Sequence, residues 1–147
     1  MGISIEGPDA AGVRELFEAA DAYGLSIYPP ENYHALDVSE FAREDVTLFV
    51  ARSAFGEAIG MAAFVESSAE LKRMYVHDDA RGTGTGAALL EAVESLARDR
   101  GIRNLRLETG EPQKAAIRLY ERAGYRRIAA FGEYVDDPTS VCMEKVL

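Results

Sequence analysis

The sequence predicts an α/β protein in which helices flank one mixed β-sheet. The chain has 147 residues, 48% of them hydrophobic, and no repeat, low-complexity tract or linker-like run, so we expect residues 1–147 to form a single domain. Three β-rich runs follow one another before the strongest helical pattern, and helical and β-rich segments then alternate. Because a doubly wound parallel sheet needs strict alternation throughout, this order indicates a mixed sheet instead.

The first quarter of the chain predicts a strand, a helix and an irregular segment. Residues 3–6 form the strand candidate. Asp9 is the expected N-cap of the helix and Gly24 its expected C-terminal glycine. Residues 26–37 contain two adjacent prolines and are expected to be irregular or weakly helical. The helix rests on an apolar stripe at i, i+3, i+4 and i+7 spacing, formed by Val13, Leu16, Phe17 and Ala20.

Three β-rich runs come next, at residues 47–52, 58–65 and 70–76. The short connection between the first two predicts a β-hairpin. In the third run Lys72 and Arg73 are adjacent polar residues, which breaks the alternation expected of a half-buried strand. A β-bulge and a solvent-exposed strand end explain this break equally well.

The clearest helix is predicted over residues 86–100. An apolar stripe takes one face of this segment and charged residues take the other, among them the favourable i, i+4 pair Glu94 and Arg98. Gly101 is expected to end the helix. The remaining pattern predicts a strand at residues 105–109, a helix at 114–123, and closing strands at 125–128 and 141–146.

Composition excludes several classes of function. The 25 acidic and 16 basic residues give a net charge of −9, which disfavours binding to nucleic acid or to an acidic membrane surface. The apolar runs are too short to span a bilayer, and the first residues lack the features of a signal peptide. Cys142 is the single cysteine, and His34 and His77 lie far apart, which argues against a metal site. We therefore expect a cytoplasmic protein without a metal.

A glycine-rich loop at residues 81–86, with the sequence Arg-Gly-Thr-Gly-Thr-Gly, precedes the strongest helix. Three glycines in five positions permit positive φ angles and let backbone N–H groups approach a ligand closely. The helix N-terminus adds unpaired N–H groups and the positive end of the helix dipole. Since Arg81 supplies a cation as well, we interpret the loop as an anion site, most simply one for phosphate, rather than a plain turn.

Two common phosphate-binding motifs fit this loop poorly. A nucleotide-hydrolase P-loop requires a lysine that is missing here. The dinucleotide pattern G-x-G-x-x-[GA] is met by Gly82, Gly84 and Ala87, and Glu108 supplies an acid about twenty residues further on. That pattern follows its strand directly, whereas residues 77–80 intervene in this chain. A nicotinamide dinucleotide-binding domain is therefore the last-ranked alternative.

A third motif accounts for the loop and for the segments around it. Residues 81–86, read as Arg-x-x-Gly-x-Gly, resemble the acyl-CoA pyrophosphate motif of the GNAT-superfamily N-acetyltransferases. Residues 70–76 resemble the central strand of that family, and residues 116–125, Ala-x-x-Leu-Tyr-Glu-x-x-Gly-Tyr, resemble its second helix motif. The resemblance covers nearly the whole chain. It implies a GNAT-like fold, with a central, mostly antiparallel sheet that is splayed between the fourth and fifth strands and flanked by helices.

The resemblance implies acetyl-CoA as co-substrate and assigns residues to its binding. Backbone groups of Met74, Tyr75 and Val76 should pair with the pantetheine amides. Gln113 stands where the family often has an asparagine that holds the pantetheine, and its longer side chain leaves the geometry of that contact open. The pyrophosphate should take backbone N–H groups of the glycine-rich loop, formed by Arg81, Gly82, Thr83, Gly84, Thr85 and Gly86.

Two residues are predicted to carry the chemistry. Tyr120 matches a tyrosine that many family members use to protonate the departing thiolate, and it would also contact the cofactor. A phenol with a pKa near 10 is close enough to a thiol of about 8.5 to act in this way. Because Tyr120 lies on an apolar helix stripe, a purely structural role is the alternative. Glu70 stands eleven positions before Arg81, where some family members carry a catalytic base, with a solvated glutamate and a water relay as the alternatives.

The predicted activity is acetyl transfer to a primary amine of a small molecule or peptide, by direct attack of the amine. Tyr28, Glu31, Tyr33 and Tyr134 lie where a family member would place its acceptor pocket. The sequence does not identify the acceptor, and it leaves a homodimer open. A non-catalytic acyl-CoA-binding sensor with the same fold is the leading alternative to an enzyme, because both would share the glycine-rich loop.

Overall fold

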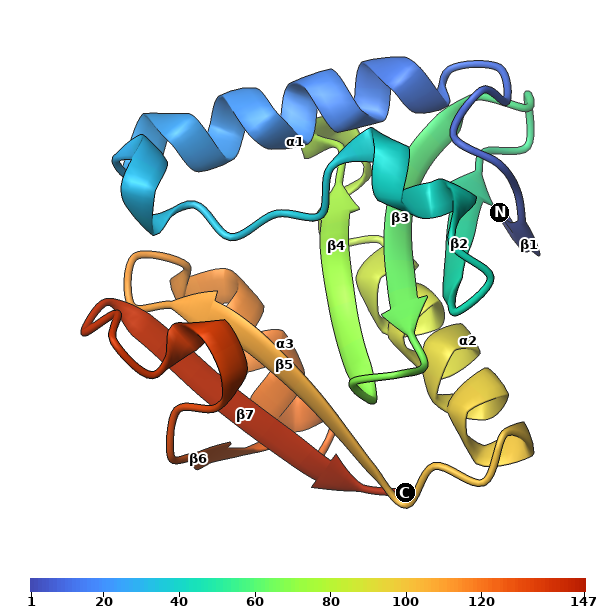
Figure 1. Cartoon of the computed structure of the whole chain (residues 1–147). Helices are drawn as coiled ribbons and strands as arrows, with labels where there is room; N and C mark the ends of the chain where they lie inside the picture. Colours follow the sequence, from blue (N-terminus) through green and yellow to red (C-terminus); the bar gives the residue numbers. More distant parts are fainter.

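The computed structural model describes residues 1–147 and contains one seven-stranded sheet and three α-helices (Figure 1). Short 3₁₀ helices lie in the connections at Pro30–Asn32, Val38–Ala42, Asp78–Ala80 and Gly132–Tyr134. The helices are α1 (Val13–Ile27), α2 (Thr85–Asp99) and α3 (Lys114–Arg122). The strands are β1 (Gly2–Ile5), β2 (Val46–Arg52), β3 (Ala58–Val65), β4 (Glu70–Val76), β5 (Asn104–Gly110), β6 (Arg126–Ile128) and β7 (Ser140–Val146). The predicted mixed α/β fold is confirmed.

The sheet divides into two parts that separate between β4 and β5. Its strand order is β1-β2-β3-β4-β5-β7-β6, and every neighbouring pair is antiparallel except β4 and β5, which are parallel. These two strands pair only through Glu70 with Arg106 and Leu71 with Leu107. Beyond that point they diverge toward α1 (Figure 1). The predicted splay is confirmed, and it leaves one edge of β4 without a partner strand from residue 72 onward.

A β-bulge explains the adjacent polar residues in β4. Lys72 pairs with Ala63 and Tyr75 pairs with Met61, so Arg73 and Met74 together stand opposite one residue of β3. Arg73 has a φ angle of +55°, a conformation that few residues other than glycine adopt. The bulge interpretation is therefore correct, and the exposed strand end is not. Bulges often redirect side chains beside active sites.

The Arg73 side chain turns under α1 and connects it to the sheet. The side chain is only 5% exposed, and its Nη1 donates to Asp21 Oδ1 over 2.6 Å. Its Nε donates to the carbonyl oxygen of Leu36 over 2.8 Å, and the guanidinium lies 4.8 Å from the ring centroid of Phe17. The Tyr33 hydroxyl donates to the same Asp21 oxygen over 2.7 Å. One buried cation thus joins β4, α1 and the segment that follows α1.

Replacing Asp21 with alanine should lower the free energy of unfolding by about 2–4 kcal/mol, because a buried guanidinium would lose its charged partner. Asp21 is itself 40% exposed, which keeps this loss below that of a fully buried pair. The exposed pair of Arg81 and Asp78, 3.1 Å apart, is the matched control. Asp78→Ala should cost less than about 1 kcal/mol in the same urea titration. Equal losses in the two variants would contradict a stabilising role for the buried pair.

Helices cover both faces of the sheet. α1 packs its apolar stripe on one face, against Leu48, Val50 and Met61 of β2 and β3. α2 packs on the other face, where Phe49, Ala51, Ala62 and Phe64 alternate with the first set along the same strands. α3 joins the second cluster through Tyr120. Because alternate residues of one strand point to opposite faces, this pattern shows that β2 and β3 are buried on both sides.

The predicted ends of α1 are wrong. The helix begins after Gly12, whose φ is +78°, rather than after Asp9, and it continues past Gly24 to Ile27. A Cβ atom at Gly24 would overlap the ring of Tyr33. Gly24 is therefore required for the close approach of Tyr33 and does not end the helix.

Glu94 is buried rather than placed on the solvent face of α2. Its side chain is 6% exposed and accepts hydrogen bonds from the Tyr125 hydroxyl and from Lys145 Nζ, each at 2.9 Å. Arg98 lies 3.8 Å from the same carboxylate, as the i, i+4 spacing predicts. Because both close partners come from segments remote in sequence, helical periodicity alone could not predict this burial.

Candidate active site

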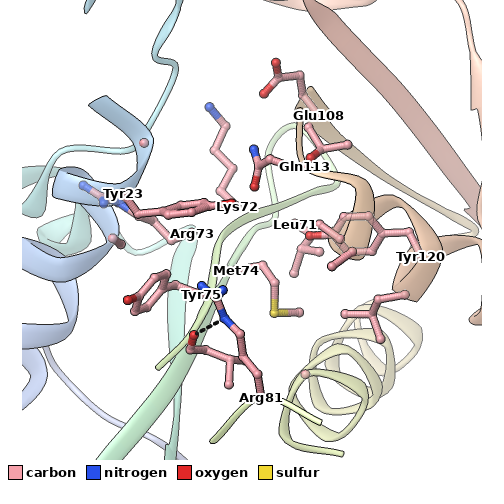
Figure 2. Close-up of a pocket in the computed structure, with 18 of the residues that line it drawn as sticks. Tyr23, Leu71, Lys72, Arg73, Met74, Tyr75, Arg81, Glu108, Gln113 and Tyr120 are labelled. Carbon is pink, nitrogen blue, oxygen red and sulfur yellow. Dashed lines mark hydrogen bonds between the residues drawn. The ribbon is translucent and has the colours of Figure 1, made fainter. Parts of the chain in front are cut away.

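A cleft of about 680 Å³ lies where β4 and β5 separate (Figure 2). Its walls come from β4, β5, the start of α3, the glycine-rich loop, and the end of α1 with the segment that follows. Ten of the eleven residues predicted to bind cofactor line it: Met74, Tyr75, Val76, Arg81, Gly82, Gly84, Thr85, Gly86, Gln113 and Tyr120. The eleventh, Thr83, turns its hydroxyl back to the carbonyl oxygen of Ala80 and to Thr85 Oγ1.

The glycine-rich loop presents a run of free backbone donors. The N–H groups of residues 82–87 donate to no acceptor in the protein, and the i→i−4 pattern of α2 starts only at Ala88. Gly82 and Gly84 have φ angles of +78° and +86°, which side-chain-bearing residues adopt only with strain. No acidic residue lies in the first turn of α2. The loop thus offers six N–H groups and a helix dipole to an anion.

Arg81 stands at the same end of the cleft. Its Nε donates to the carbonyl oxygen of Val76 over 3.3 Å, and its Nη2 lies 3.1 Å from Asp78 Oδ1 (Figure 2). About half of the Arg81 side chain is exposed. Its guanidinium remains open to solvent and carries positive charge next to the free N–H groups.

Tyr120 lies in the wall of the cleft. Its ring is 5% exposed and packs edge-on against Tyr125, with 5.9 Å between the ring centroids. The Tyr120 hydroxyl has no hydrogen-bond partner in the protein. Every fully buried side-chain oxygen and nitrogen has such a partner, so the Tyr120 hydroxyl is not fully buried and reaches the open cleft. Burial, with a smaller effect of the Glu108 charge, raises the pKa of Tyr120 above its ordinary value of 10. The phenol is therefore protonated at neutral pH.

Glu108 lies on the same side of the cleft as Tyr120 (Figure 2). It lies on β5, lines the cleft, and accepts a hydrogen bond from Ser140 Oγ over 2.7 Å. Burial raises its pKa from 4.5 to about 7, although the Ser140 hydrogen bond and the positive charges of His34 and Lys72 oppose the shift. A carboxyl group with this pKa is half ionised near neutral pH and can accept a proton. The sequence pointed to Glu108 only as a ribose-binding acid.

Glu70 does not reach the cleft. It lies at the joined end of β4 and β5, is 7% exposed, and accepts a hydrogen bond from the Tyr134 hydroxyl over 2.9 Å. Tyr134 is buried as well and is absent from the cleft lining. Burial and the nearby Glu70 charge raise the pKa of Tyr134. These two predicted site residues therefore pair with each other behind the cleft wall.

The remaining predicted acceptor residues divide between cleft and surface. Tyr28 and Tyr33 line the cleft, whereas Glu31 is exposed outside it. The Tyr28 hydroxyl accepts a hydrogen bond from Gln113 Nε2 over 3.1 Å. A Cβ atom at Gly110 would overlap this hydroxyl, so the glycine makes room for Tyr28.

Sequence reasoning missed two further residues of the cleft, His34 and Lys72. His34 Nε2 lies 2.7 Å from Asp137 Oδ2, and Asp137 also accepts hydrogen bonds from the backbone N–H and hydroxyl of Thr139. These hydrogen bonds hold the pKa of Asp137 well below its usual range, and the one from the Thr139 side chain has the largest effect. His34 and Asp137 are 103 positions apart, so no local pattern predicts their contact. Lys72 was noticed only as a break in strand alternation.

The chain matches the Acetyltransferase (GNAT) family over residues 13–125, which is more than half of its length. The protein belongs to this family. Among its relatives, a protein of Azospirillum brasilense named IAA acetyltransferase is 39% identical over 149 residues, covering 99% of this chain and 97% of the relative. The GNAT assignment makes the chain an acyltransferase and shows that the nicotinamide-binding alternative is wrong.

Solved structures of GNAT proteins share the fold. A Klebsiella pneumoniae protein assigned as an acyl-CoA N-acyltransferase is 40% identical, with a TM-score of 0.80 over 99% of this chain and 97% of that one. A GNAT acetyltransferase of Elizabethkingia anophelis, solved with acetyl-CoA bound, has a TM-score of 0.71 at 18% identity and covers 99% and 97% of the two chains. No helix of this GNAT protein has the length and apolarity needed to cross a membrane.

Proposed function

We propose that the protein transfers an acetyl group from acetyl-CoA to a primary amine. The observation that carries this proposal is the cleft between β4 and β5. It is lined at one end by five residues with free N–H groups, and the Tyr120 and Glu108 side chains also line it. The fold that this chain shares with the acetyl-CoA-bound Elizabethkingia protein supports the choice of co-substrate.

The residues of the cleft suit the chemistry of acetyl-CoA. The pyrophosphate is an anion, and the N–H groups of the glycine-rich loop with Arg81 form an anion site in a protein that is acidic overall. The pantetheine arm is an extended chain with two amides, and the open edge of β4 at Met74–Val76 offers backbone partners to such a chain. Gln113 adds a side-chain amide on the opposite wall.

The geometry supports direct attack by the amine. Acetyl-CoA supplies an acyl group activated as a thioester. Glu108 takes a proton from the acceptor's ammonium group, and the neutral amine nitrogen then forms a bond to the carbonyl carbon as the C–S bond breaks, releasing its second proton to solvent. Tyr120 donates its proton to the departing sulfur and regains a proton from solvent, to which Glu108 releases one. The products are an N-acetyl amide, free CoA thiol and one proton released to solvent, so protons and atoms balance.

Glu108 replaces Glu70 as the proposed base for a geometric reason. A base must lie within reach of the proton that it abstracts. Glu108 lines the cleft that holds the Tyr120 hydroxyl, whereas Glu70 is enclosed against Tyr134.

Acetyl-CoA at about a hundred times its Kd should stabilise the protein by about 2.7 kcal/mol, which for a chain of this size raises Tm by about 5–10 °C. NADPH and ATP at equal concentration should produce no comparable shift. The same protein should release CoA thiol from acetyl-CoA when primary amines are added. A thermal shift without thiol release from any amine would favour the non-catalytic sensor. A shift with NADPH or ATP alone would contradict the acetyl-CoA assignment.

A further inference from the structure

Most charged groups at the end of the cleft opposite Arg81 already have partners. His34 pairs with Asp137, and Arg73 pairs with Asp21. Two groups that line this end differ, because Lys72 has no hydrogen bond and Glu108 has only the hydroxyl of Ser140. Figure 2 shows both side chains extending toward this end, with Gln113 between them.

The Lys72 ammonium is poorly satisfied for a group so little exposed. Its side chain is 14% exposed and lies over the ring of Tyr134, with Nζ 5.4 Å from the ring centroid. Its nearest carboxylate oxygen belongs to Glu133, at 3.5 Å and without a hydrogen bond. Since Glu133 is 58% exposed, water competes for that carboxylate. A largely desolvated ammonium with free donors is a favourable partner for an anionic ligand.

The charge of this end of the cleft restricts which anion fits. Glu108, Glu133 and Asp137 are gathered here against Lys72 and His34. A phosphate dianion would meet three carboxyl groups, which makes it an unfavourable ligand. A ligand that carries both an ammonium and a carboxylate group would meet complementary partners. Its carboxylate would lie near Lys72 and its ammonium group near Glu108.

We infer that the acceptor is an amine that also carries a carboxylate, as an amino acid does, and that Lys72 binds this carboxylate while Glu108 receives the amine. This inference rests on the proposed acetyl transfer. It gives Lys72 a role in acceptor specificity and explains why a lysine occupies the strand position just before the bulge. An amine without a carboxylate would leave the Lys72 ammonium with only the exposed Glu133 carboxylate near it.

The test compares L-amino acids with their carboxamides, in which an uncharged amide of similar size replaces the carboxylate, at equal concentrations of the unprotonated amine. For the best acceptor of a panel of common L-amino acids, wild type should show a kcat/KM for CoA release about 10- to 100-fold above that of the matching amide, as a charge-assisted hydrogen bond would give. Lys72→Met should lower kcat/KM for the acid by about the same factor and change that for the amide by less than about threefold. Lys72→Arg should retain part of the preference, because it keeps the charge.

Two controls keep the outcomes distinct. Lys114 also lines the cleft but is 65% exposed and already paired with Glu111, so Lys114→Met should leave the acid-to-amide ratio unchanged. A normal thermal shift with acetyl-CoA shows that Lys72→Met is folded. If wild type acetylates amines without preferring the acids, or if Lys72→Met keeps the preference, the specificity inference is overturned while acetyl transfer stands. If no amine of either kind yields CoA, the proposed function fails and this inference falls with it.

Discussion

Replacing Glu108 with glutamine should lower kcat/KM for the amine by about 100- to 10,000-fold, the range that a general base contributes. The substitution keeps the size of the side chain and its contact with Ser140 Oγ, but it removes the group that accepts the proton. Affinity for acetyl-CoA should change little, because the free N–H groups that face the pyrophosphate lie on the glycine-rich loop. Steady-state kinetics of CoA release, with acetyl-CoA binding measured by calorimetry, separate the two effects.

The pH dependence gives a second readout for Glu108. The base acts only when ionised, so wild-type kcat/KM should rise as pH passes through about 7, the pKa that burial gives this carboxyl group. The Glu108→Gln variant should lack this rise. Because the folded-state pKa lies above the ordinary value of 4.5, wild type should also lose stability relative to the variant as pH increases from 4.5 to about 7. Unfolding titrations across this range check the shift independently of activity.

Glu70→Gln is the matched control for this prediction. The substitution alters a buried carboxyl group on the neighbouring strand. That carboxyl group accepts a hydrogen bond from the Tyr134 hydroxyl and does not line the cleft. We expect lower stability, because a buried hydrogen bond to a charged acceptor is weakened, but an unchanged inflection near pH 7. If Glu70→Gln removed the inflection and Glu108→Gln kept it, the base would be Glu70 as the sequence predicted.

The strand β4 and the conformation of the glycine-rich loop could be predicted because their signals are local. β4 begins and ends at the predicted residues, and free N–H groups run through the glycine-rich loop to the residue after it, at positions 82–87. The splay between β4 and β5 came from the family resemblance and was confirmed by the two-residue pairing of those strands. β4 and the glycine-rich loop depend on residues close together in the chain, whereas the splay joins distant residues and needed the resemblance.

The acceptor end of the cleft could not be predicted because its contacts join distant residues. His34 meets Asp137, and Tyr134 meets Glu70, across 103 and 64 positions. The bulge at Arg73 also changes which side of β4 the following residues face, so simple alternation could not assign the residues of this strand to one face or the other. The pattern of a single sequence shows the periodicity of helices and strands. It does not show how loops fold over the sheet, which determines this end of the site.

Tyr120 and Tyr125 form an aromatic pair in which only the Tyr120 hydroxyl faces the cleft. The pair therefore allows a catalytic role of one hydroxyl to be compared with a structural role of the other. The Tyr125 hydroxyl donates to the buried carboxylate of Glu94, whereas the Tyr120 hydroxyl has no protein partner. Burial keeps the Tyr120 phenol protonated until negative charge develops on the sulfur. Because transfer from this phenol to a thiolate of ordinary pKa is uphill, its contribution should be smaller than that of the base.

Tyr120→Phe should therefore leave the Kd for acetyl-CoA within about threefold of wild type and lower kcat by about 10- to 1,000-fold. Tyr125→Phe removes the other hydroxyl of the pair and should show the opposite pattern, with near-normal kcat and a loss of about 1–3 kcal/mol of stability as Glu94 loses a hydrogen bond. Calorimetry, CoA-release kinetics and urea unfolding on both variants measure all three quantities. An unchanged kcat in Tyr120→Phe would remove the proton-donor role and leave Tyr120 as an aromatic residue of the core, because nothing but the hydroxyl distinguishes the two side chains.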